Sequence, residues 1–433
     1  MSNTVAFYTL GCKLNFAETS TIGKQFLDKG YKIVEFNEHA DVYVINTCTV
    51  TEGADKECRQ IVRRALRNNP EGFVAVTGCY AQLRPDQISS IKGVDAVLGS
   101  NEKFKLFSLI DNFNKKELSC IHITPTDKLD DFITAFSSDA DSRTRAFFKI
   151  QDGCDYKCSY CTIPLARGKS RSMQPDTMTD KFIELLKNDY KEIVLTGVNV
   201  GDYGKLINTN FYSALTKLVE VEGNFRLRIS SIEPNLLTDE VLQLVKTNDK
   251  MCKHFHIPLQ NGSPKILKLM KRRYTASFYK KLVNKVASEI SDVGIGVDVI
   301  VGFPGETEED FLLTFNLLKD LPISYLHVFT YSDRPNTKSI EMENKVPIEI
   351  KKERNNRLRI LSQKKHHEFL KKMIGKNLEV LFEAEEHNGF IQGFASNYVR
   401  VALPYDSKLI NKLANVKIIR VEDNICYAEL INN

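Results

Sequence analysis

The chain has 433 residues, of which 42% are hydrophobic and 27% charged, with a formal net charge of +5. This length predicts two or three domains with cores of ordinary size. No apolar run approaches the roughly 20 residues of a membrane-spanning helix, and the first residues lack a signal-peptide pattern. We therefore expect a cytoplasmic protein with no membrane partner. Its ten cysteines favour metal or redox use over disulfides.

The first part of the chain, residues 1–115, alternates short apolar runs with helical patterns. Such alternation predicts an open, mostly parallel α/β sheet. The apolar runs are rich in Val, Ile and aromatic residues, as buried strands are. Strands are expected at residues 5–10, 41–46 and 73–77, and helices at residues 15–29 and 51–69.

A cysteine follows each of these three strands: Cys12, Cys48 and Cys79. Open α/β sheets place their ligands at the carboxyl ends of parallel strands, so the three thiols could meet at one edge. The alternative is that they are three small buried side chains, because free cysteine is often buried. The pattern alone leaves both interpretations open. Cys58 lies within a helical pattern, and we expect it to be structural.

Residues 116–143 are polar and have no periodic pattern, which predicts a linker. Strand–helix alternation then resumes over residues 144–372 and predicts a barrel-like parallel sheet. Strands are expected at residues 146–151, 193–196, 225–230, 254–259, 296–301 and 325–330, and helices at residues 176–187, 211–219, 238–247, 277–290 and 307–318.

The loop after the first of these strands carries Cys154, Cys158 and Cys161 in the spacing C-x-x-x-C-x-x-C. Zinc would require a fourth protein ligand nearby, and the next cysteine is Cys252. Iron–sulfur clusters are usually held by four thiolates. Three thiolates in one short loop therefore predict a four-iron cluster with one iron open to a small ligand.

Active residues of parallel barrels gather at the carboxyl ends of strands. Gly197 and Asn199 follow the second expected strand, Glu233 the third and Gln260 the fourth. A glycine in such a position is by itself only a turn signal. Thr307 and Asp310 come before a helical pattern, and we interpret them as a helix cap.

Basic residues cluster in three places. Arg167, Lys169 and Arg171 follow the cysteine loop and could steer an anionic substrate towards it. A second group lies at residues 265–273, and a third at residues 351–372, where nine Lys/Arg face two Glu. A solvated helix face is the ordinary explanation of one such run. Three runs around an expected active edge favour a phosphate-rich partner.

The last part, residues 373–433, changes character and predicts a small antiparallel β-barrel. It carries six Lys/Arg against eight Asp/Glu, so its charge does not indicate RNA binding. Any RNA contact would come from single basic residues and from aromatic rings, which could equally be core; these residues are Arg400, Lys417, Arg420, Phe394 and Tyr398. Five strands are expected, at residues 378–383, 389–395, 398–403, 416–421 and 426–430.

These motifs resemble those of a known family. The central triplet is similar to that of radical S-adenosylmethionine enzymes, in which Tyr160 would lie beside the adenine. Thr9-Leu-Gly-Cys12-Lys-Leu-Asn15, with the motifs around Cys48 and Cys79, resembles the N-terminal motifs of methylthiotransferases. Residues 375–383 and 396–401 resemble the RNA-binding TRAM module.

The resemblance implies two 4Fe–4S clusters. Cys154, Cys158 and Cys161 would hold the cluster that cleaves S-adenosylmethionine, and Cys12, Cys48 and Cys79 an auxiliary cluster that carries the sulfur. The cofactor would contact Tyr160, Gly197, Asn199, Glu233 and Gln260.

The resemblance also implies a substrate and partners. The Lys-Leu pair before Asn15 is like the branch that adds a methylthio group to C2 of threonylcarbamoyladenosine in the anticodon stem-loop of tRNA. Each turnover would consume two S-adenosylmethionine molecules and need an external electron donor and a sulfur donor. Isopentenyladenosine in tRNA and an aspartate of a ribosomal protein are the alternative substrates. A radical enzyme that transfers no sulfur and a non-catalytic RNA-binding metalloprotein are the alternatives from other classes.

Overall fold

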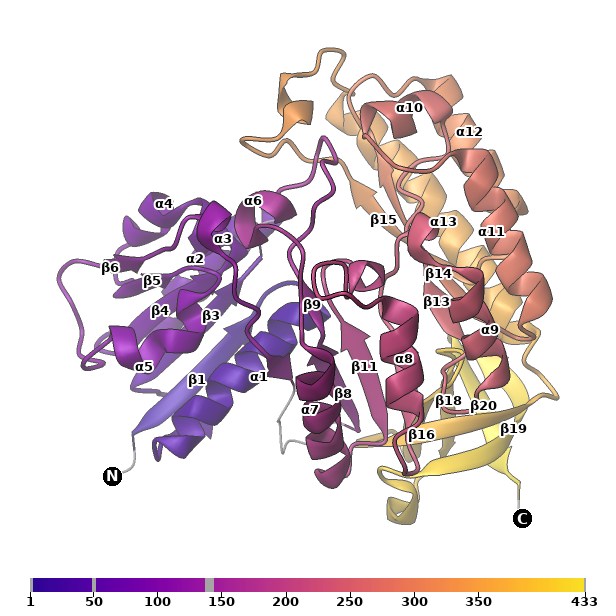
Figure 1. The fold of residues 1–433 in the computed structure, drawn as a ribbon, viewed down its shortest axis with the longest axis horizontal. Coiled ribbons are helices and arrows are strands. Elements are labelled where there is room, and N and C mark those ends of the chain that lie inside the picture. The colour runs from indigo at the N-terminus through magenta and orange to yellow at the C-terminus, as the bar shows by residue number, and fades with distance from the viewer. Residues whose placement is uncertain (1–2, 49–51, 137–143, 432–433) are drawn as a thin grey trace.

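The computed structural model describes residues 3–48, 52–136 and 144–431. They form three parts in chain order: a sheet with its helices, a larger strand–helix part and a small barrel (Figure 1). In Figure 1 the first part is indigo to violet, the second runs from magenta to orange, and the barrel at the C-terminal end is yellow. The predicted fold class is confirmed in all three parts.

The first part is a parallel sheet of six strands in the order β2-β1-β3-β4-β5-β6. Both of its faces are covered, because Tyr43 and Ile45 pack into one hydrophobic cluster and Val42 and Val44 into another. Cys58 is fully buried in the first cluster, as expected. The strands are β1 (Thr4–Thr9), β2 (Lys32–Val34), β3 (Val42–Thr47), β4 (Phe73–Gly78), β5 (Ala96–Leu98) and β6 (Cys120–His122), and the helices are α1 (Lys13–Asp28), α2 (Glu52–Asn68), α3 (Cys79–Leu83), α4 (Pro85–Ser89) and α5 (Leu106–Leu109).

The structure differs from the expectation of a patternless linker at residues 116–143. Strand β6 extends the first sheet, and β7 (Ala135–Phe136) pairs antiparallel with β8 (Arg145–Lys149) of the second part. Strands of three and two residues are too short to show a hydrophobic period in the sequence. They are recognised only from their backbone pairing with neighbouring strands. Residues 137–143, and residues 49–51 at the expected start of α2, lie outside the described part of the chain.

The second part is an incomplete barrel of parallel strands. Its sheets have the orders β12-β11-β8-β7 and β13-β14-β15, and parallel bridges at Leu227–Met251 and Ser231–His256 join β12 to the stretch that contains β13. The parallel strands are β8 (Arg145–Lys149), β11 (Glu192–Thr196), β12 (Arg226–Ile229), β13 (His254–His256), β14 (Gly294–Val301) and β15 (Tyr325–Thr330). Two short antiparallel strands, β9 (Gln151–Asp152) and β10 (Arg171–Ser172), form a separate pair.

Helices follow the barrel strands and bury their apolar stripes against them. The expected helices are all present, with ends that differ by a few residues at most. They are α7 (Pro175–Lys187), α8 (Phe211–Val219), α9 (Asp239–Thr247), α11 (Ala276–Glu289) and α12 (Glu308–Asp320), joined by the short α6 (Ile163–Arg167) and α10 (Pro264–Leu269) and by the long α13 (Ile348–Lys371).

The third part is a closed barrel in the order β16-β17-β18-β20-β19. The pairing of β18 with β20 is parallel, and this alone departs from the expected antiparallel barrel. Its strands are β16 (Asn377–His387), β17 (Phe390–Ala395), β18 (Arg400–Pro404), β19 (Leu413–Glu422) and β20 (Ile425–Leu430).

Buried charged groups attach this barrel to the second part. Arg226 and Arg228 of β12 each lie 2.7 Å from a carboxylate oxygen of Glu192, which is fully buried. The same guanidinium groups donate to the backbone carbonyls of Phe394 (2.6 Å) and Ala395 (3.2 Å) in β17. The buried charges are paired, and further N–H groups of the two guanidinium groups donate to the carbonyls of β17. This contact therefore fixes the position of the third part against the second.

Candidate active site

The loop with Cys154, Cys158 and Cys161 connects β9 to the short helix α6, and β10 returns alongside β9 at its base. Gly153 begins the loop with a φ of +70°, and a Cβ added there would lie 1.9 Å from the carbonyl oxygen of Lys169. Only glycine fits this position without a shift of the backbone. The backbone therefore fixes where the first cysteine points.

The three thiols of this loop influence one another. Burial, together with the charge of the neighbouring thiolates, raises the pKa of Cys154 and of Cys161 to about 12. Burial also raises the pKa of Cys158, although Arg272 opposes the shift. Metals bind the thiolate form, so a metal centre bound at this loop would have to supply the positive charge that stabilises the ionised sulfurs.

Arg272 contacts this loop directly. Its guanidinium group donates to Cys158 Sγ (3.2 Å), pairs with the Glu233 carboxylate and lies over the Tyr274 ring, 5.1 Å from the centroid. Its side chain is only 3% exposed. Glu233, expected at the cofactor, is thus engaged by Arg272. Sequence reasoning counted Arg272 only as part of a basic run and missed this contact.

Cys12, Cys48 and Cys79 follow β1, β3 and β4, which are neighbours in the first sheet. A Cβ added at Gly11 would lie 3.2 Å from Cys48 Sγ. Burial raises the pKa of Cys12; Arg167 opposes the shift and Cys79 adds to it. The structure therefore brings the three cysteines to one edge of the sheet, which is one of the two arrangements that the sequence pattern left open.

A cavity of about 930 Å³ lies where the three parts meet. The side chains from β8, β13 and β15 are at alternate positions, so each strand turns one face to the cavity. The first part contributes the segment with Cys12, and the third part contributes β16 and Tyr398. The lining includes Cys12, Lys13, Arg145, Phe147, Thr196, Gly197, Ser230, Ser231, His254, His256, Tyr325, His327, Glu383, Glu385 and Tyr398.

A smaller cavity of about 210 Å³ lies beside the cysteine loop. Tyr160, Cys161 and Gln260 line it, together with Asp298 of β14. Asp298 Oδ1 is 2.8 Å from Nε2 of His256, which lines the larger cavity. The cavity beside Cys161 and the cavity beside Cys12 therefore adjoin at this hydrogen-bonded pair.

Several buried polar atoms at the carboxyl ends of β11 and β12 have no hydrogen-bond partner among the described residues. They are the amide nitrogen and amide oxygen of the Asn199 side chain, the Thr196 hydroxyl and the Ser230 hydroxyl. Such atoms are costly unless a ligand satisfies them. Gly197 lies so close to Gln151 that an added Cβ would be 2.8 Å from its amide oxygen. The amine, carboxylate and hydroxyl groups of S-adenosylmethionine fit this set of donors and acceptors.

Two basic residues that follow the cysteine loop do not have the expected role. Arg167 is 2% exposed and Arg171 is 7% exposed, and both approach Asp152. The prediction that these two residues steer a substrate is therefore wrong, because their charges are buried and paired. Lys169 between them is exposed and stays available.

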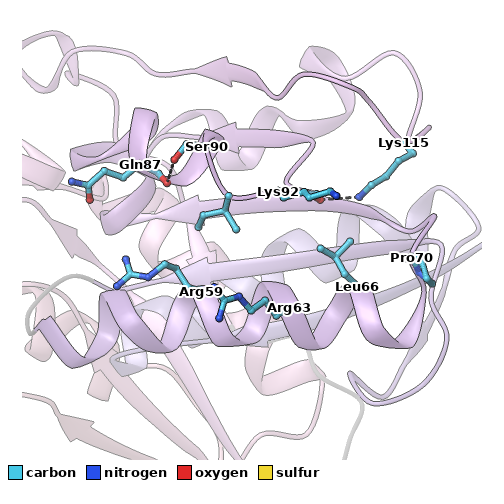
Figure 2. A pocket seen from close by; sticks show the side chains of 10 residues that line it. Arg59, Arg63, Leu66, Pro70, Gln87, Ser90, Lys92 and Lys115 are labelled. Atoms are coloured by element: carbon cyan, nitrogen blue, oxygen red, sulfur yellow. Dashed lines mark hydrogen bonds between the residues drawn. The ribbon is translucent and has the colours of Figure 1, made fainter.

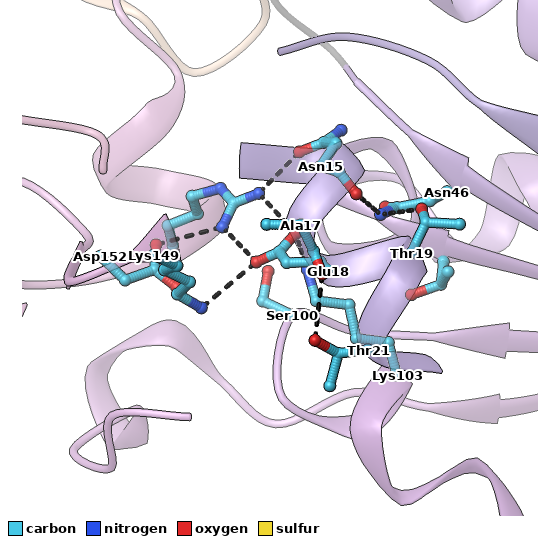
Figure 3. A network of polar contacts seen from close by, with 12 residues as sticks. Asn15, Ala17, Glu18, Thr19, Thr21, Asn46, Ser100, Lys103, Lys149 and Asp152 are labelled. Atoms are coloured by element: carbon cyan, nitrogen blue, oxygen red, sulfur yellow. Dashed lines mark hydrogen bonds and ion pairs between the residues drawn. The ribbon is translucent and has the colours of Figure 1, made fainter. Parts of the chain in front are cut away.

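Arg167 belongs instead to a buried network between the first and second parts. Figure 3 shows this network around Glu18, with Lys103 and Lys149. Glu18 of α1 is fully buried and binds Lys103 (2.5 Å), Arg167 (2.8 Å) and Lys149 of β8 (3.3 Å). Arg167 also donates to Asn15 Oδ1 (2.8 Å). Burial alone would raise the pKa of Glu18, but the three cations hold it well below its usual range. The network joins the loops of the two cysteine triads.

The other two basic runs also contain both exposed cations and buried, paired ones. Lys265 and Lys268 are exposed on α10. Arg354 of α13 is buried and pairs with Glu306 (2.7 Å). Only the exposed members can meet a phosphate-rich partner.

The aromatic residues named as possible RNA contacts or core residues have intramolecular partners. Phe394 and Tyr398 stack on each other with centroids 5.0 Å apart. Arg145 lies 4.5 Å from the centroid of Phe394, and Arg228 lies 4.9 Å from that of Tyr398. These rings join the third part to the second, and Tyr398 reaches the larger cavity.

A basic groove that sequence reasoning did not single out lies on the first part (Figure 2). It measures about 890 Å³ and shares no lining residue with either cavity described above. Its cations come from α2 and from the segments beside β5 and β6; they are Arg59, Arg63, Lys92 and Lys115. Lys115 is paired with Asp95 (2.9 Å).

Comparison with known proteins places each part. Residues 4–99 match the Uncharacterized protein family UPF0004, residues 148–318 the Radical SAM superfamily and residues 371–431 the TRAM domain. A solved structure of the radical S-adenosylmethionine methyltransferase TsrM from Kitasatospora setae is similar in fold, with a TM-score of 0.57 at 15% identity over 78% of this chain and 77% of that chain. Fold and cysteine loop thus define a radical S-adenosylmethionine enzyme.

Sequence relatives narrow the class. The chain is 42% identical to the threonylcarbamoyladenosine tRNA methylthiotransferase MtaB of Bacillus subtilis, over 96% of this chain and 94% of that protein. It is 33% identical to the tRNA-2-methylthio-N(6)-dimethylallyladenosine synthase of Clostridium perfringens (strain SM101), over 98% and 96%. The chain belongs to the tRNA methylthiotransferase family of radical S-adenosylmethionine enzymes. None of the helices in its described part is both long and apolar enough to cross a bilayer.

Proposed function

We propose that this enzyme adds a methylthio group to C2 of N6-threonylcarbamoyladenosine at position 37 of tRNA, in the cytoplasm. It would use two S-adenosylmethionine molecules per turnover and two 4Fe–4S clusters. An external electron donor would reduce the cluster of the domain of residues 144–372, and a sulfur donor would supply the cluster of the domain of residues 1–115. Residues 373–433 would form the RNA-binding domain. The observation that carries the proposal is the adjoining pair of cavities, one beside Cys161 and the other beside Cys12.

The six cysteines of the two triads are the proposed cluster ligands: Cys154, Cys158 and Cys161 for the radical cluster, and Cys12, Cys48 and Cys79 for the auxiliary one. When bound, the clusters would supply the radical and the sulfur, chemistry that no protein acid or base provides. The protein's own contribution is position. The buried network at Glu18 holds the two cysteine-bearing segments in fixed register.

Contacts with S-adenosylmethionine are proposed for the residues that line or face the smaller cavity and the strand ends. Tyr160 and Gln260 line that cavity, and Gly197 and Asn199 supply the close approach and the unpartnered polar atoms. Glu233 would act through Arg272, which it pairs with.

Iron counting and a triple substitution test the two-cluster proposal. After anaerobic reconstitution the chain should hold about eight iron atoms, and replacement of Cys12, Cys48 and Cys79 by alanine should lower this to about four. The triple variant should still cleave S-adenosylmethionine after reduction but transfer no sulfur. About four iron atoms in the unsubstituted enzyme, or full turnover by the triple variant, would overturn the auxiliary cluster. Iron without cleavage of S-adenosylmethionine would indicate a non-catalytic binding protein.

Mass spectrometry of tRNA nucleosides tests the substrate. A deletion strain should lack 2-methylthio-threonylcarbamoyladenosine and keep other modified nucleosides. The second candidate is isopentenyladenosine, which is the N6-dimethylallyladenosine in the name of a relative that is 33% identical. Loss of the methylthio group from that nucleoside alone would establish the second candidate instead. Loss from neither would direct the search to a ribosomal-protein aspartate.

A further inference from the structure

Lys13 is a cation of the larger cavity that has no acidic partner among the residues that the structure describes. It is the first residue of α1, directly after Cys12, and its side chain lines the cavity and is half-buried. Its Nζ lies 5.8 Å from the centroid of the Tyr398 ring. Within the described part of the chain, no carboxylate comes within ion-pair distance of it.

The other charged groups of the lining are paired or exposed. Arg145, the second cation, lies 2.9 Å from Glu383, and Glu383 is also 3.7 Å from Arg400. The Glu385 side chain is 79% exposed, and Glu35 is exposed at the edge of the cavity. Lys13 is therefore the positive charge in this cavity that remains to be matched. A partly desolvated ammonium group gains most from an anion that arrives with the substrate.

The two nucleosides named for the relatives differ in this property. The threonylcarbamoyl group carries a carboxylate and a hydroxyl, whereas the dimethylallyl group is a hydrocarbon. Both substituents are attached at N6, which shares the Watson–Crick edge of adenine with C2. A substituent at N6 therefore lies on the same side of the base as the carbon that receives sulfur, and Lys13 is covalently next to Cys12.

We propose that Lys13 binds the carboxylate of the threonylcarbamoyl group and thereby selects this nucleoside over its uncharged counterparts. This inference rests on the function proposed above. Ser231 also lines the cavity, and its hydroxyl group is offered to the substrate hydroxyl. A site built to pair with a charged group rejects analogues that lack the group more strongly than an apolar pocket rejects a polar analogue.

The experiment uses the reconstituted full-length enzyme and two anticodon stem-loop RNAs. One RNA carries threonylcarbamoyladenosine, and the other carries its methyl ester, in which the negative charge is removed. The unsubstituted enzyme should prefer the acid by about 10- to 100-fold in kcat/KM, because a charge-assisted hydrogen bond is lost with the ester. In Lys13→Met the acid-to-ester ratio should fall to about one, and in Lys13→Arg it should be retained. The change should appear mainly in KM.

Lys24→Met is the matched control. Lys24 lies on the same helix but pairs with Glu184 away from the cavity, so this variant should keep the full acid-to-ester ratio. An unsubstituted enzyme that uses acid and ester equally, or a Lys13→Met variant that keeps the ratio, would overturn the role of Lys13 and leave the proposed function standing. Methylthiolation of neither RNA, but of an isopentenyladenosine RNA, would overturn both.

Discussion

At the scale of single residues, Gly153 controls the first cysteine of the central loop. Its φ of +70° and the 1.9 Å approach of the Lys169 carbonyl to an added Cβ exclude any side chain. We predict that Gly153→Ala displaces Cys154 and lowers the iron content after reconstitution from about eight to about four atoms per chain. Iron and sulfide analysis checks this.

Gly389 offers a control for backbone strain alone. It also has a positive φ, of +81°, but no atom lies within 4 Å of an added Cβ. Gly389→Ala should therefore lower the free energy of unfolding by about 1 kcal/mol and leave the iron content unchanged. A full complement of iron in Gly153→Ala would show that the close approach does not matter.

Arg272 is the residue for which the site makes the clearest kinetic prediction. Its hydrogen bond to Cys158 Sγ and its pairing with Glu233 place a positive charge against a proposed cluster ligand. Arg272→Gln should slow cleavage of S-adenosylmethionine by about 10- to 100-fold, the usual effect of losing a partner of a metal ligand. The rate of 5′-deoxyadenosine formation after reduction measures this.

Lys268→Gln is the control for Arg272. Lys268 is an exposed cation on the preceding helix α10, and its removal should change the rate less than twofold. Equal rates in the two variants would contradict a specific role for Arg272.

At the scale of elements, the start of α12 confirms the predicted helix cap. The Thr307 hydroxyl accepts from the Asp310 backbone N–H, and the Asp310 carboxylate accepts from the Thr307 backbone N–H (3.0 Å), which makes a capping box. Asp310 also accepts from Ser263 (2.7 Å) and pairs with Lys265 (2.5 Å). The cap thus ties α12 to the start of α10.

Asp310→Asn should cost about 1–2 kcal/mol of unfolding free energy at pH 7. Burial would raise the pKa of Asp310, but hydrogen bonds from Lys265, Ser263 and Thr307 bring it to about 2. A carboxyl with a lowered folded-state pKa stabilises above its unfolded pKa of about 4 and loses this contribution as the pH falls towards 2. The difference in unfolding midpoint between enzyme and variant should therefore be constant from pH 8 to pH 5 and shrink below pH 4.

The exposed Glu309 in the same turn provides the comparison. Glu309→Gln should change the free energy of unfolding by less than about 0.5 kcal/mol at every pH. A loss in Asp310→Asn that grows as the pH falls would contradict the assigned charge state.

The success of sequence reasoning depends on how far apart the interacting residues are. Helix α8 (Phe211–Val219) has the predicted ends, because its apolar stripe and its Asn210 cap are local signals. The pattern allowed the three cysteines of the first part to meet, because parallel strands share an edge, but it equally allowed three separate buried side chains. Arg167 was misjudged because its partner Glu18 lies 149 residues away in the sequence. The unpartnered atoms of Asn199 had no local signal at all.

At the scale of the whole molecule, the active cavity exists only where three parts meet, so its geometry depends on the contacts between parts. Glu18 is the centre of the contact between the first two. Glu18→Gln leaves Lys103, Lys149 and Arg167 buried without a counter-charge, and breaking a buried pair in this way costs about 3–5 kcal/mol. We predict that amide hydrogen exchange in α1 and β8 becomes at least about 100-fold faster at pH 7.

The pH dependence of this effect has a definite sign. The pKa of Glu18 is held well below its usual range, so its stabilising contribution is complete above the unfolded pKa of about 4.3 and is lost only as the pH falls towards the folded value. The difference between enzyme and variant should thus be the same at pH 8 and pH 6. Glu184→Gln removes a surface pair between the same two parts, with Lys24, and should change exchange by less than about fivefold. Unchanged exchange in Glu18→Gln would mean that packing alone holds the two cysteine-bearing parts together.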